Sequence, residues 1–376
     1  MNTTVQEQPL LLSFLRKNAV FCIALCAAVV TAFFVPPDAT YLSYFDLKTL
    51  TCLFCTLGVI CALKNIRFFT ILARGIVLRF RTVRSAVLAL VCITFVGSML
   101  IANDMALLTF LPLGYFVLTE SRKEEYMAFT FIMQNIAANL GGMLTPFGNP
   151  QNLYLYTKFE IPTGEFLAIM FPPFLLSVLM IVAACHLLKN DPIALQDEMA
   201  AALPRGRTVL HLLLFALSIV AVFRVIPYYI ALVIIAVFLL IFDRRALARV
   251  DYPLLLTFVC FFIFSGNMAR IPAVREFFSA LLARDTLVFS VLSCQVISNV
   301  PSAVLLSQFT NAYLELLLGV NIGGTGTLIA SLASLITFRE YLAHNPGKAR
   351  AYLLRSSAWN FGFLVVLVLF CRFVPW

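Results

Sequence analysis

Residues 139–152 read NLGGMLTPFGNPQN, and residues 321–331 read NIGGTGTLIAS. Both stretches contain the pattern N-x-G-G-x-x-T inside an otherwise apolar segment. Consecutive glycines favour a break in a helix, because glycine adopts conformations that other residues avoid. In the first stretch Pro146 also cannot donate the backbone hydrogen bond that would continue the helix. We therefore predict two interrupted helices, at 126–157 and at 321–338.

A second pair of polar breaks precedes these stretches. The apolar segment 85–118 is broken near its middle by Asn103-Asp104, and the segment 286–309 is broken by Ser298-Asn299. Breaks at membrane depth are tolerated only where protein or a water-filled cavity covers them. We interpret both segments as re-entrant hairpins with an asparagine at each tip.

The composition indicates a membrane protein. Of the 376 residues, 62% are hydrophobic and 12% are charged, and the mean hydropathy is +0.96. A soluble domain has about 45–50% apolar and about 25% charged residues. We predict an all-α integral membrane protein with about nine spanning helices, each needing about 20 mainly apolar residues, besides the two hairpins. The predicted spans are 19–35, 46–63, 126–157, 164–188, 208–225, 227–242, 252–268, 321–338 and 357–374.

The net charge of +9 comes from lysines and arginines between the apolar segments. Residues 64–84 alone carry six of them, interleaved with apolar residues as in an interfacial helix. Basic loops face the cytoplasm, so we expect a multi-pass protein of a bacterial inner membrane with a cytoplasmic N-terminus. This distribution is not that of a nucleic-acid-binding surface. The lipid bilayer is the partner that we expect.

The paired motifs divide the chain into two repeats. Residues 1–188 hold the first hairpin and interrupted helix, 208–376 hold the second pair, and 189–207 form a cytoplasmic linker. Counting the spans puts the mouths of the two hairpins on opposite sides of the membrane, so the repeats are inverted. Inverted repeats with interrupted helices are the pattern of secondary transporters.

The chemistry of the four breaks suits ion binding. Carbonyls of an unwound segment can coordinate a cation, and the free N–H groups at the start of a half-helix favour an anion. No lysine or arginine lies in any of the four motifs, so amides, hydroxyls and helix ends would hold an anion. Enzyme motifs such as H-E-x-x-H and G-x-S-x-G are absent. We expect a transporter without catalytic residues, cofactor or metal other than a sodium ion.

Several motifs resemble those of the ion transporter superfamily. They are Ala102-Asn103-Asp104 with Leu107-Leu108-Thr109, the run from Gly141 to Asn152, and Ser298-Asn299-Val300-Pro301. That superfamily contains citrate transporters, divalent-anion:sodium symporters, arsenite pump proteins and some sodium/proton antiporters. Within it, the chain looks like the bacterial anion-permease, citrate-transporter-like branch. The resemblance covers nearly the whole chain.

The resemblance implies elevator-type transport of a small anion coupled to Na⁺ or H⁺, and it suggests a homodimer. The substrate-binding residues that it implies are Asn103, Thr145, Asn149, Asn152, Ser298, Asn299, Thr327 and Ser331. The coupling-ion residues are Asn103, Asp104, Gly148, Asn299 and Gly324. The sequence departs from the Ser-Asn-Thr pattern that dicarboxylate symporters carry at both tips, and the second loop lacks the proline and final asparagine of the first.

Asp104 allows two interpretations. A carboxylate at membrane depth costs about 2.5–3.5 kcal/mol and is by default a functional hypothesis, so Asp104 would bind the coupling ion. Alternatively, it caps a half-helix in a hydrated mouth. The function is open in the same way. The leading expectation is a cation-coupled transporter of a carboxylate or inorganic oxyanion, and the alternative is a cation/proton antiporter or metalloid exporter of the same fold.

Overall fold

The computed structural model describes residues 18–193 and 203–374, and these residues are almost entirely helical. The N-terminus and part of the linker predicted at 189–207 lie outside the described residues. The first half contains α2 (Ala19–Phe34), η1 (Ala39–Tyr44), α3 (Leu47–Asn65), α4 (Phe68–Val77), α5 (Val83–Leu100), α6 (Asn103–Glu120), η2 (Glu124–Tyr126), α7 (Met127–Gly141), η3 (Gly142–Leu144), α8 (Pro150–Lys158) and α9 (Thr163–His186). The second contains α10 (Arg205–Val222), α11 (Tyr228–Phe242), α12 (Arg244–Ala248), α13 (Tyr252–Arg270), α14 (Pro272–Arg284), α15 (Thr286–Ile297), α16 (Asn299–Leu306), α17 (Tyr313–Ile322), α18 (Leu332–His344) and α19 (Ala349–Phe373).

The chain is a multi-pass membrane protein. Among the described residues, six helices are long and apolar enough to cross a membrane: α3, α5, α9, α10, α13 and α19. Five of these match predicted spans, and the sixth, α5, is an arm of a predicted hairpin. The other predicted spans consist of shorter helices. The number of crossings and the inverted orientation of the halves stay predictions.

The predicted breaks are present, but the bounds of the second interrupted helix were wrong. The first breaks between α7 and α8, as predicted within 126–157. The second comprises α17 and α18, so it begins before residue 321 and ends after residue 338. Its first half, YLELLLGVNI, has only 10 residues and carries Glu315, and it is too short to meet the length rule for a spanning helix. The last helix also begins earlier than predicted, because the basic start of α19 continues the helix beyond the apolar part.

One order of elements occurs twice along the chain. A short helix is followed by a two-helix hairpin, an interrupted helix and one long helix, as α4 to α9 and again as α14 to α19. The hairpin arms α5 and α6 pack on α7, and the arms α15 and α16 pack on α17. The half-helix that follows each break packs on the hairpin of the other half. The second-half helix α18 packs on α6, and the first-half helix α8 packs on α16. Each half therefore completes the surroundings of the other's hairpin.

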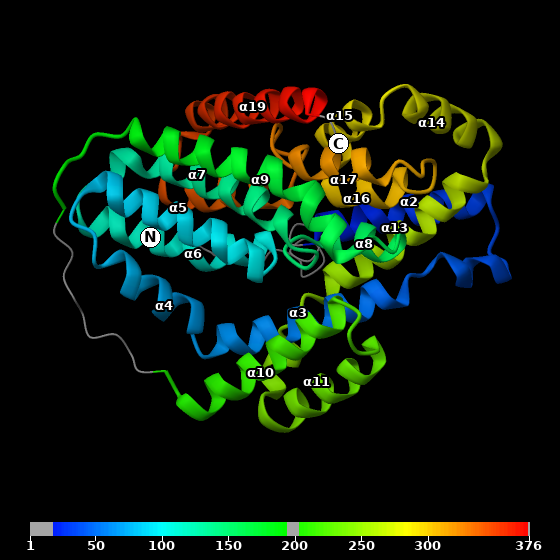
Figure 1. The fold of residues 1–376 in the computed structure, drawn as a ribbon, viewed down its shortest axis with the longest axis horizontal. Coiled ribbons are helices and arrows are strands. Elements are labelled where there is room, and N and C mark those ends of the chain that lie inside the picture. The colour runs from blue at the N-terminus through cyan, green and yellow to red at the C-terminus, as the bar shows by residue number, and fades with distance from the viewer. Residues whose placement is uncertain (1–17, 194–202, 375–376) are drawn as a thin grey trace, which may run out of the picture.

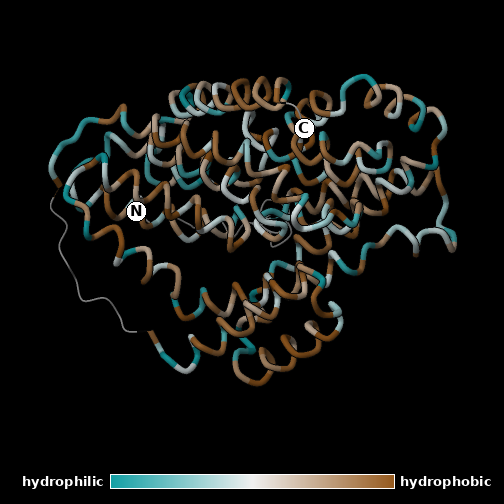
Figure 2. The backbone as a smooth tube through the Cα atoms, in the orientation of Figure 1, coloured by the Kyte–Doolittle hydropathy of each residue, from teal (hydrophilic) through white to brown (hydrophobic). Residues whose placement is uncertain are grey.

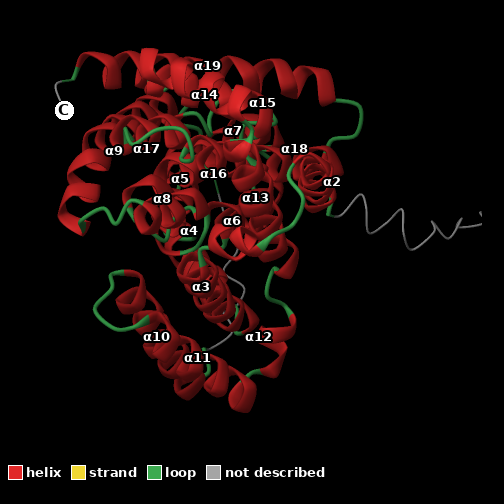
Figure 3. Ribbon diagram, turned by 90° about the vertical axis from the view of Figure 1, so that its right-hand side faces the viewer, coloured by secondary structure: helices red, strands yellow, loops and turns green. Residues whose placement is uncertain are grey.

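A second group of helices stands beside this body. The helices α3, α10, α11 and α12 pack on one another and lie together at the bottom of Figures 1 and 3. Hydrophobic residues run along α10 and α11 in Figure 2, and many of them are exposed, such as Val233 and Ile241. Exposed apolar side chains on this scale are expected where lipid is the solvent. The group meets the body mainly through α3 with α8 and α4.

Candidate functional site

The four breaks bring most of the predicted site residues into one buried region. Asn103, Asn149, Asn152 and Asn299 are each at most 4% exposed. They belong to the first hairpin tip, the end of the first unwound loop, the start of α8 and the second hairpin tip. A Cβ atom added to Gly324, in the second unwound loop, would lie 3.0 Å from Asn299 Nδ2 and 3.4 Å from Asn139 Oδ1. Residues from both halves therefore converge on the backbone of Gly324.

At the first hairpin tip, Asn103 connects the tip to the first interrupted helix. Its Nδ2 donates to Asn139 Oδ1 at 3.2 Å, and its Oδ1 accepts the backbone N–H of Asp104 at 3.0 Å. Asn103 thus satisfies one free donor at the start of α6, as a capping residue does. Its carboxamide oxygen has a second lone pair free for a ligand.

The first unwound loop is held by side chains at its two ends. Asn152 Nδ2 lies 3.1–3.2 Å from the carbonyl oxygens of Gly142, Met143 and Thr145. Thr145 Oγ1 donates to the carbonyl of Met99 on α5, at 2.7 Å. Gly148 packs so closely that a Cβ there would lie 2.4 Å from the Gly142 carbonyl oxygen. The loop ends at Asn149, whose extended backbone precedes Pro150 in the first turn of α8, a position that proline favours.

Two hydrogen bonds between side-chain amides join the first break to the second. Asn149 Nδ2 lies 3.3 Å from Asn321 Oδ1, and Asn321 Nδ2 lies 2.6 Å from Asn152 Oδ1. Asn321 also donates to the carbonyl of Leu317 in its own helix. These bonds join α8 to α17, and they require both halves of the chain.

The second hairpin tip is built differently from the first. The Asn299 N–H donates to the Ala330 carbonyl at 3.0 Å, and Asn299 Oδ1 accepts the N–H of Val300 at 2.9 Å. Ser298 has φ 75° and ψ 160°, a region that is essentially confined to glycine and costs about 1–3 kcal/mol for other residues. At the matching place in the first tip, Ala102 has a negative φ of −39°.

The remaining predicted residues hold the second loop. Thr327 Oγ1 donates to the Gln295 carbonyl at 3.0 Å, as Thr145 does to Met99 in the first half. Ser331 Oγ accepts the Ala333 N–H at 3.1 Å and so caps α18. Both contacts are structural in this conformation.

Two unsatisfied acceptors lie at the first hairpin tip and at the end of the first unwound loop. Asp104 Oδ1 and Asn149 Oδ1 are buried and accept no hydrogen bond. Buried polar atoms of native proteins are nearly always paired, so an unpaired acceptor at such a place indicates a ligand or an ordered water. The region also collects the starts of α6, α8, α16 and α18, whose free N–H groups carry partial positive charge. The arrangement can accept a cation on oxygens and an anion on N–H groups.

Sequence reasoning missed three carboxamides of this region: Asn139, Asn321 and Gln295. Asn139 and Asn321 open the repeated motif, whose amides are expected to hold an ion, but neither residue is among the predicted site residues. For Asn139 the sequence offered a signal, because Asn135 and Asn139 are four residues apart and lie on one face of a helix. Gln295 precedes the second tip inside an apolar segment, and no pattern in the sequence singles it out.

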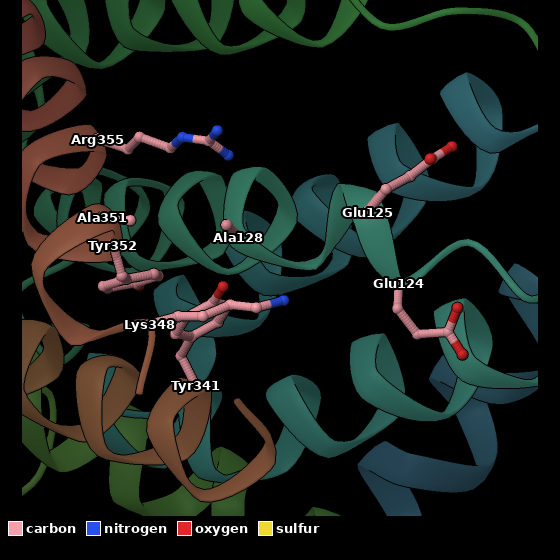
Figure 4. A pocket seen from close by; sticks show the side chains of 8 residues that line it. All are labelled: Glu124, Glu125, Ala128, Tyr341, Lys348, Ala351, Tyr352 and Arg355. Carbon is pink, nitrogen blue, oxygen red and sulfur yellow. The ribbon is translucent and has the colours of Figure 1, made fainter. Parts of the chain in front are cut away.

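A separate cavity lies away from this region. It has a volume of about 230 Å³ and is lined by Glu124, Glu125, Ala128, Tyr341, Lys348, Ala351, Tyr352 and Arg355. In Figure 4 the basic side chains extend from the start of α19, whereas the two glutamates come from the segment before α7. It includes none of the predicted site residues.

The chain is similar in sequence to several known membrane proteins. A family model described as citrate transporter matches residues 9–313. The uncharacterized transporter MJ0456 of Methanocaldococcus jannaschii is 31% identical over 331 residues, which cover 86% of this chain and 89% of that protein. The inner membrane protein YbiR of Escherichia coli is 29% identical over 340 residues, 86% of this chain and 88% of that protein. The silicon efflux transporter LSI3 of rice is 30% identical over 201 residues, 50% of this chain and 41% of that protein.

Proposed function

The chain belongs to the citrate transporter family and is a membrane transporter, and we propose that it moves a small anion by secondary active transport. The proposed substrate is a carboxylate or an inorganic oxyanion. The proposed driving force is a sodium or proton gradient. The membrane is proposed to be a bacterial inner membrane, by analogy with YbiR, with the N-terminus in the cytoplasm and the chain in a homodimer.

One observation carries the anion proposal. Four helices begin in the buried region where the two halves meet, and the asparagine side chains around it are neutral. Helix starts bind anions through their free N–H groups without any basic side chain. A site of this kind can release its substrate, because it holds the anion by hydrogen bonds and partial charges rather than by a fixed ion pair.

The coupling proposal rests on Asp104. Its carboxylate lies in the first turn of α6, next to the tip residue Asn103. A substrate anion and an ionised carboxylate repel each other strongly in a region of low dielectric. A sodium ion or a proton on Asp104 removes that repulsion, so cation and anion would bind together. This requirement is what links the movement of the anion to the cation gradient.

The proposed movement is an elevator motion of the body that holds the breaks. Contacts between this body and the α3, α10, α11 and α12 group would then differ between the two end states. Two such contacts are present here. Phe147 of the first loop packs against Phe223, with ring centroids 5.9 Å apart, and Arg224 donates to the Tyr156 carbonyl.

The test is uptake into liposomes that contain the purified protein. A panel of carboxylates and oxyanions is tested with and without an inward sodium or proton gradient. We expect one anion to accumulate only with a gradient, and Asn103→Ala or Asn299→Ala to abolish the accumulation. Gradient-independent uptake would contradict the coupling, and absence of any anion uptake would contradict the anion proposal.

A second candidate is a cation/proton antiporter or a metalloid exporter of the same fold. The rice relative, whose name describes silicon efflux, and the lack of a basic residue at the breaks both favour it. In this case addition of a cation, or of a neutral metalloid acid, would dissipate a preset gradient although no anion accumulates. Asp104→Asn should then abolish the dissipation by a cation.

A further inference from the structure

The two unwound loops are fastened in different ways, and the difference centres on Gln295 in α15. Gln295 Nε2 lies 2.9 Å from the Gly323 carbonyl oxygen, 3.2 Å from that of Thr325 and 3.1 Å from that of Val291. Gln295 Oε1 accepts the Thr327 N–H at 2.9 Å. This pattern fixes the orientation of the amide, because the opposite orientation would place its oxygen against three carbonyl oxygens.

The loop is wrapped closely around this amide. Gly326 has φ +124°, and a Cβ atom there would lie 2.2 Å from Gln295 Oε1. Only glycine fits such a close approach at a positive φ. The second loop is therefore shaped around the Gln295 side chain, whose amide group satisfies carbonyls on both the loop and the hairpin arm.

A cluster of carbonyl oxygens between a hairpin arm and an unwound loop is the environment that a hard cation takes in a protein. In the second half, the neutral N–H₂ group of Gln295 already occupies the space among these carbonyl oxygens. The matching position in the first hairpin arm, counted from the tips Asn103 and Asn299, is Met99, whose side chain has no such donor. There the loop carbonyls are bonded instead by Asn152 of α8, within the interrupted helix itself.

The free acceptors at matching positions of the two sets of breaks are also distributed unequally. Asp104 Oδ1 and Asn149 Oδ1 of the first half are buried without a partner. At the matching places of the second half stand Val300, which has no acceptor in its side chain, and Ser331, whose hydroxyl oxygen caps α18. The second half thus has neither an anionic group nor a free acceptor at these positions.

We propose that the Gln295 carboxamide substitutes for a cation in the second half, so that this transporter binds its coupling ion only in the first half, at the tip that carries Asp104. This inference rests on the proposed function, because it gives the number and place of the coupling ions. It also gives Gln295 a positioning role, since the amide fastens the second loop to its hairpin whatever the cation gradient is.

The test uses the purified full-length protein and follows its apparent Tm in NaCl, LiCl and choline chloride. Asp104→Asn alone should show no stabilisation by sodium or lithium relative to choline. Gln295→Glu replaces the N–H₂ group by an oxygen that faces carbonyl oxygens, so at pH 8 the double variant Asp104→Asn/Gln295→Glu should regain a cation-dependent rise in Tm of about 2 °C or more. At pH 5 that dependence should shrink, because a protonated carboxyl again donates a hydrogen bond.

Gln134→Glu provides a matched control. Gln134 is also a buried glutamine of this body, and its Nε2 donates to Thr94 Oγ1 at 3.0 Å and to the Phe110 carbonyl at 3.1 Å, but no unwound loop contributes a carbonyl. In the Asp104→Asn background it should lower Tm equally in all three salts. If Asp104→Asn alone keeps its stabilisation by sodium, a second native cation site exists and the proposal is overturned, even when the double variant does not fold.

An equal response of the two glutamate variants to sodium would also overturn the proposal. None of these measurements needs a transported anion, so they stand apart from the uptake test of the proposed function. Where uptake is measurable, its dependence on the coupling cation should follow a Hill coefficient of about 1. A value of about 2 would count against a single site.

Discussion

The side-chain amide of Asn149 donates to the carboxamide oxygen of Asn321 at 3.3 Å, across the boundary between the two halves of the chain. Asn321 in turn donates to Asn152 at 2.6 Å. Hydrogen bonds therefore join the two breaks directly.

Asn321→Ala should destabilise the protein by about 1–3 kcal/mol, because it leaves the buried Asn152 Oδ1 without its donor and removes one of the two acceptors of Asn149 Nδ2. The measurement is the apparent Tm in detergent together with uptake. Asn360→Ala is the control, since Asn360 is equally buried but bonds only to Ser356 in its own helix. An equal decrease in Tm in both variants would show that the contact between the breaks stabilises the protein no more than a bond within one helix.

Gly142→Ala should abolish transport. The added Cβ would lie 2.3 Å from Asn149 Oδ1 and 2.9 Å from the Gly148 carbonyl oxygen, so the unwound loop would have to shift. Gly362→Ala in α19 meets nothing within 4 Å and should raise stability by about 0.5–1 kcal/mol, as alanine does in a helix interior. Uptake at the wild-type rate by Gly142→Ala would contradict the packing described here.

Asp104→Asn should remove the dependence of uptake on the cation gradient, while asparagine keeps the ability to cap a helix. The measurement compares uptake with and without the gradient. Asp46→Asn is the control, because Asp46 caps α3 through the Thr49 N–H at 2.9 Å and is not part of the breaks. Full uptake with full gradient dependence in Asp104→Asn would leave the carboxylate with a capping role alone.

Asp191 should give stability a simple pH dependence. Its hydrogen bond from Lys123, with Nζ to Oδ2 at 3.0 Å, lowers the pKa of the Asp191 carboxyl below its usual value. A group with a lowered pKa stabilises the folded state above its unfolded pKa, about 3.9 for aspartate, and loses that effect as the pH falls through the lowered value.

The difference in Tm between the wild type and Asp191→Asn should therefore be the same at pH 8 and at pH 5. It should shrink only below about pH 4. Glu124→Gln should have little effect at any of these pH values, because Glu124 is exposed and forms no ion pair among the described residues. A loss that already shrinks between pH 8 and pH 5 would contradict the assigned pKa shift.

The sequence predicted the breaks well because glycine, proline and asparagine act locally. The helix ends at Gly141 and restarts at Pro150, and the hairpin arms meet at Asn103 and Asn299, where the polar residues stand. The bounds at 321–338 failed because a half-helix of 10 residues does not need to span anything by itself. Length rules for spanning helices do not apply to the pieces of an interrupted one.

The roles of the site residues were less accessible to sequence reasoning. Thr327 and Ser331 were expected to bind substrate, and here they bond to Gln295 and cap α18. Their assignment to the substrate stays a prediction. The bonds between Asn149 and Asn321 or between Gln295 and Gly323 join residues far apart in the sequence or on different helices. Such pairs depend on how helices pack, and no spacing rule along the chain gives that information.

The positive φ of Ser298 bears on which side chains each hairpin tip can tolerate. The first tip has a negative φ at Ala102, so side chains there can be exchanged with little conformational cost. The second tip already holds a non-glycine residue in a conformation that favours glycine, and most replacements with a larger side chain would add to the strain. The second tip should therefore tolerate fewer substitutions at Ser298 than the first tip tolerates at Ala102, beside the carboxylate of Asp104.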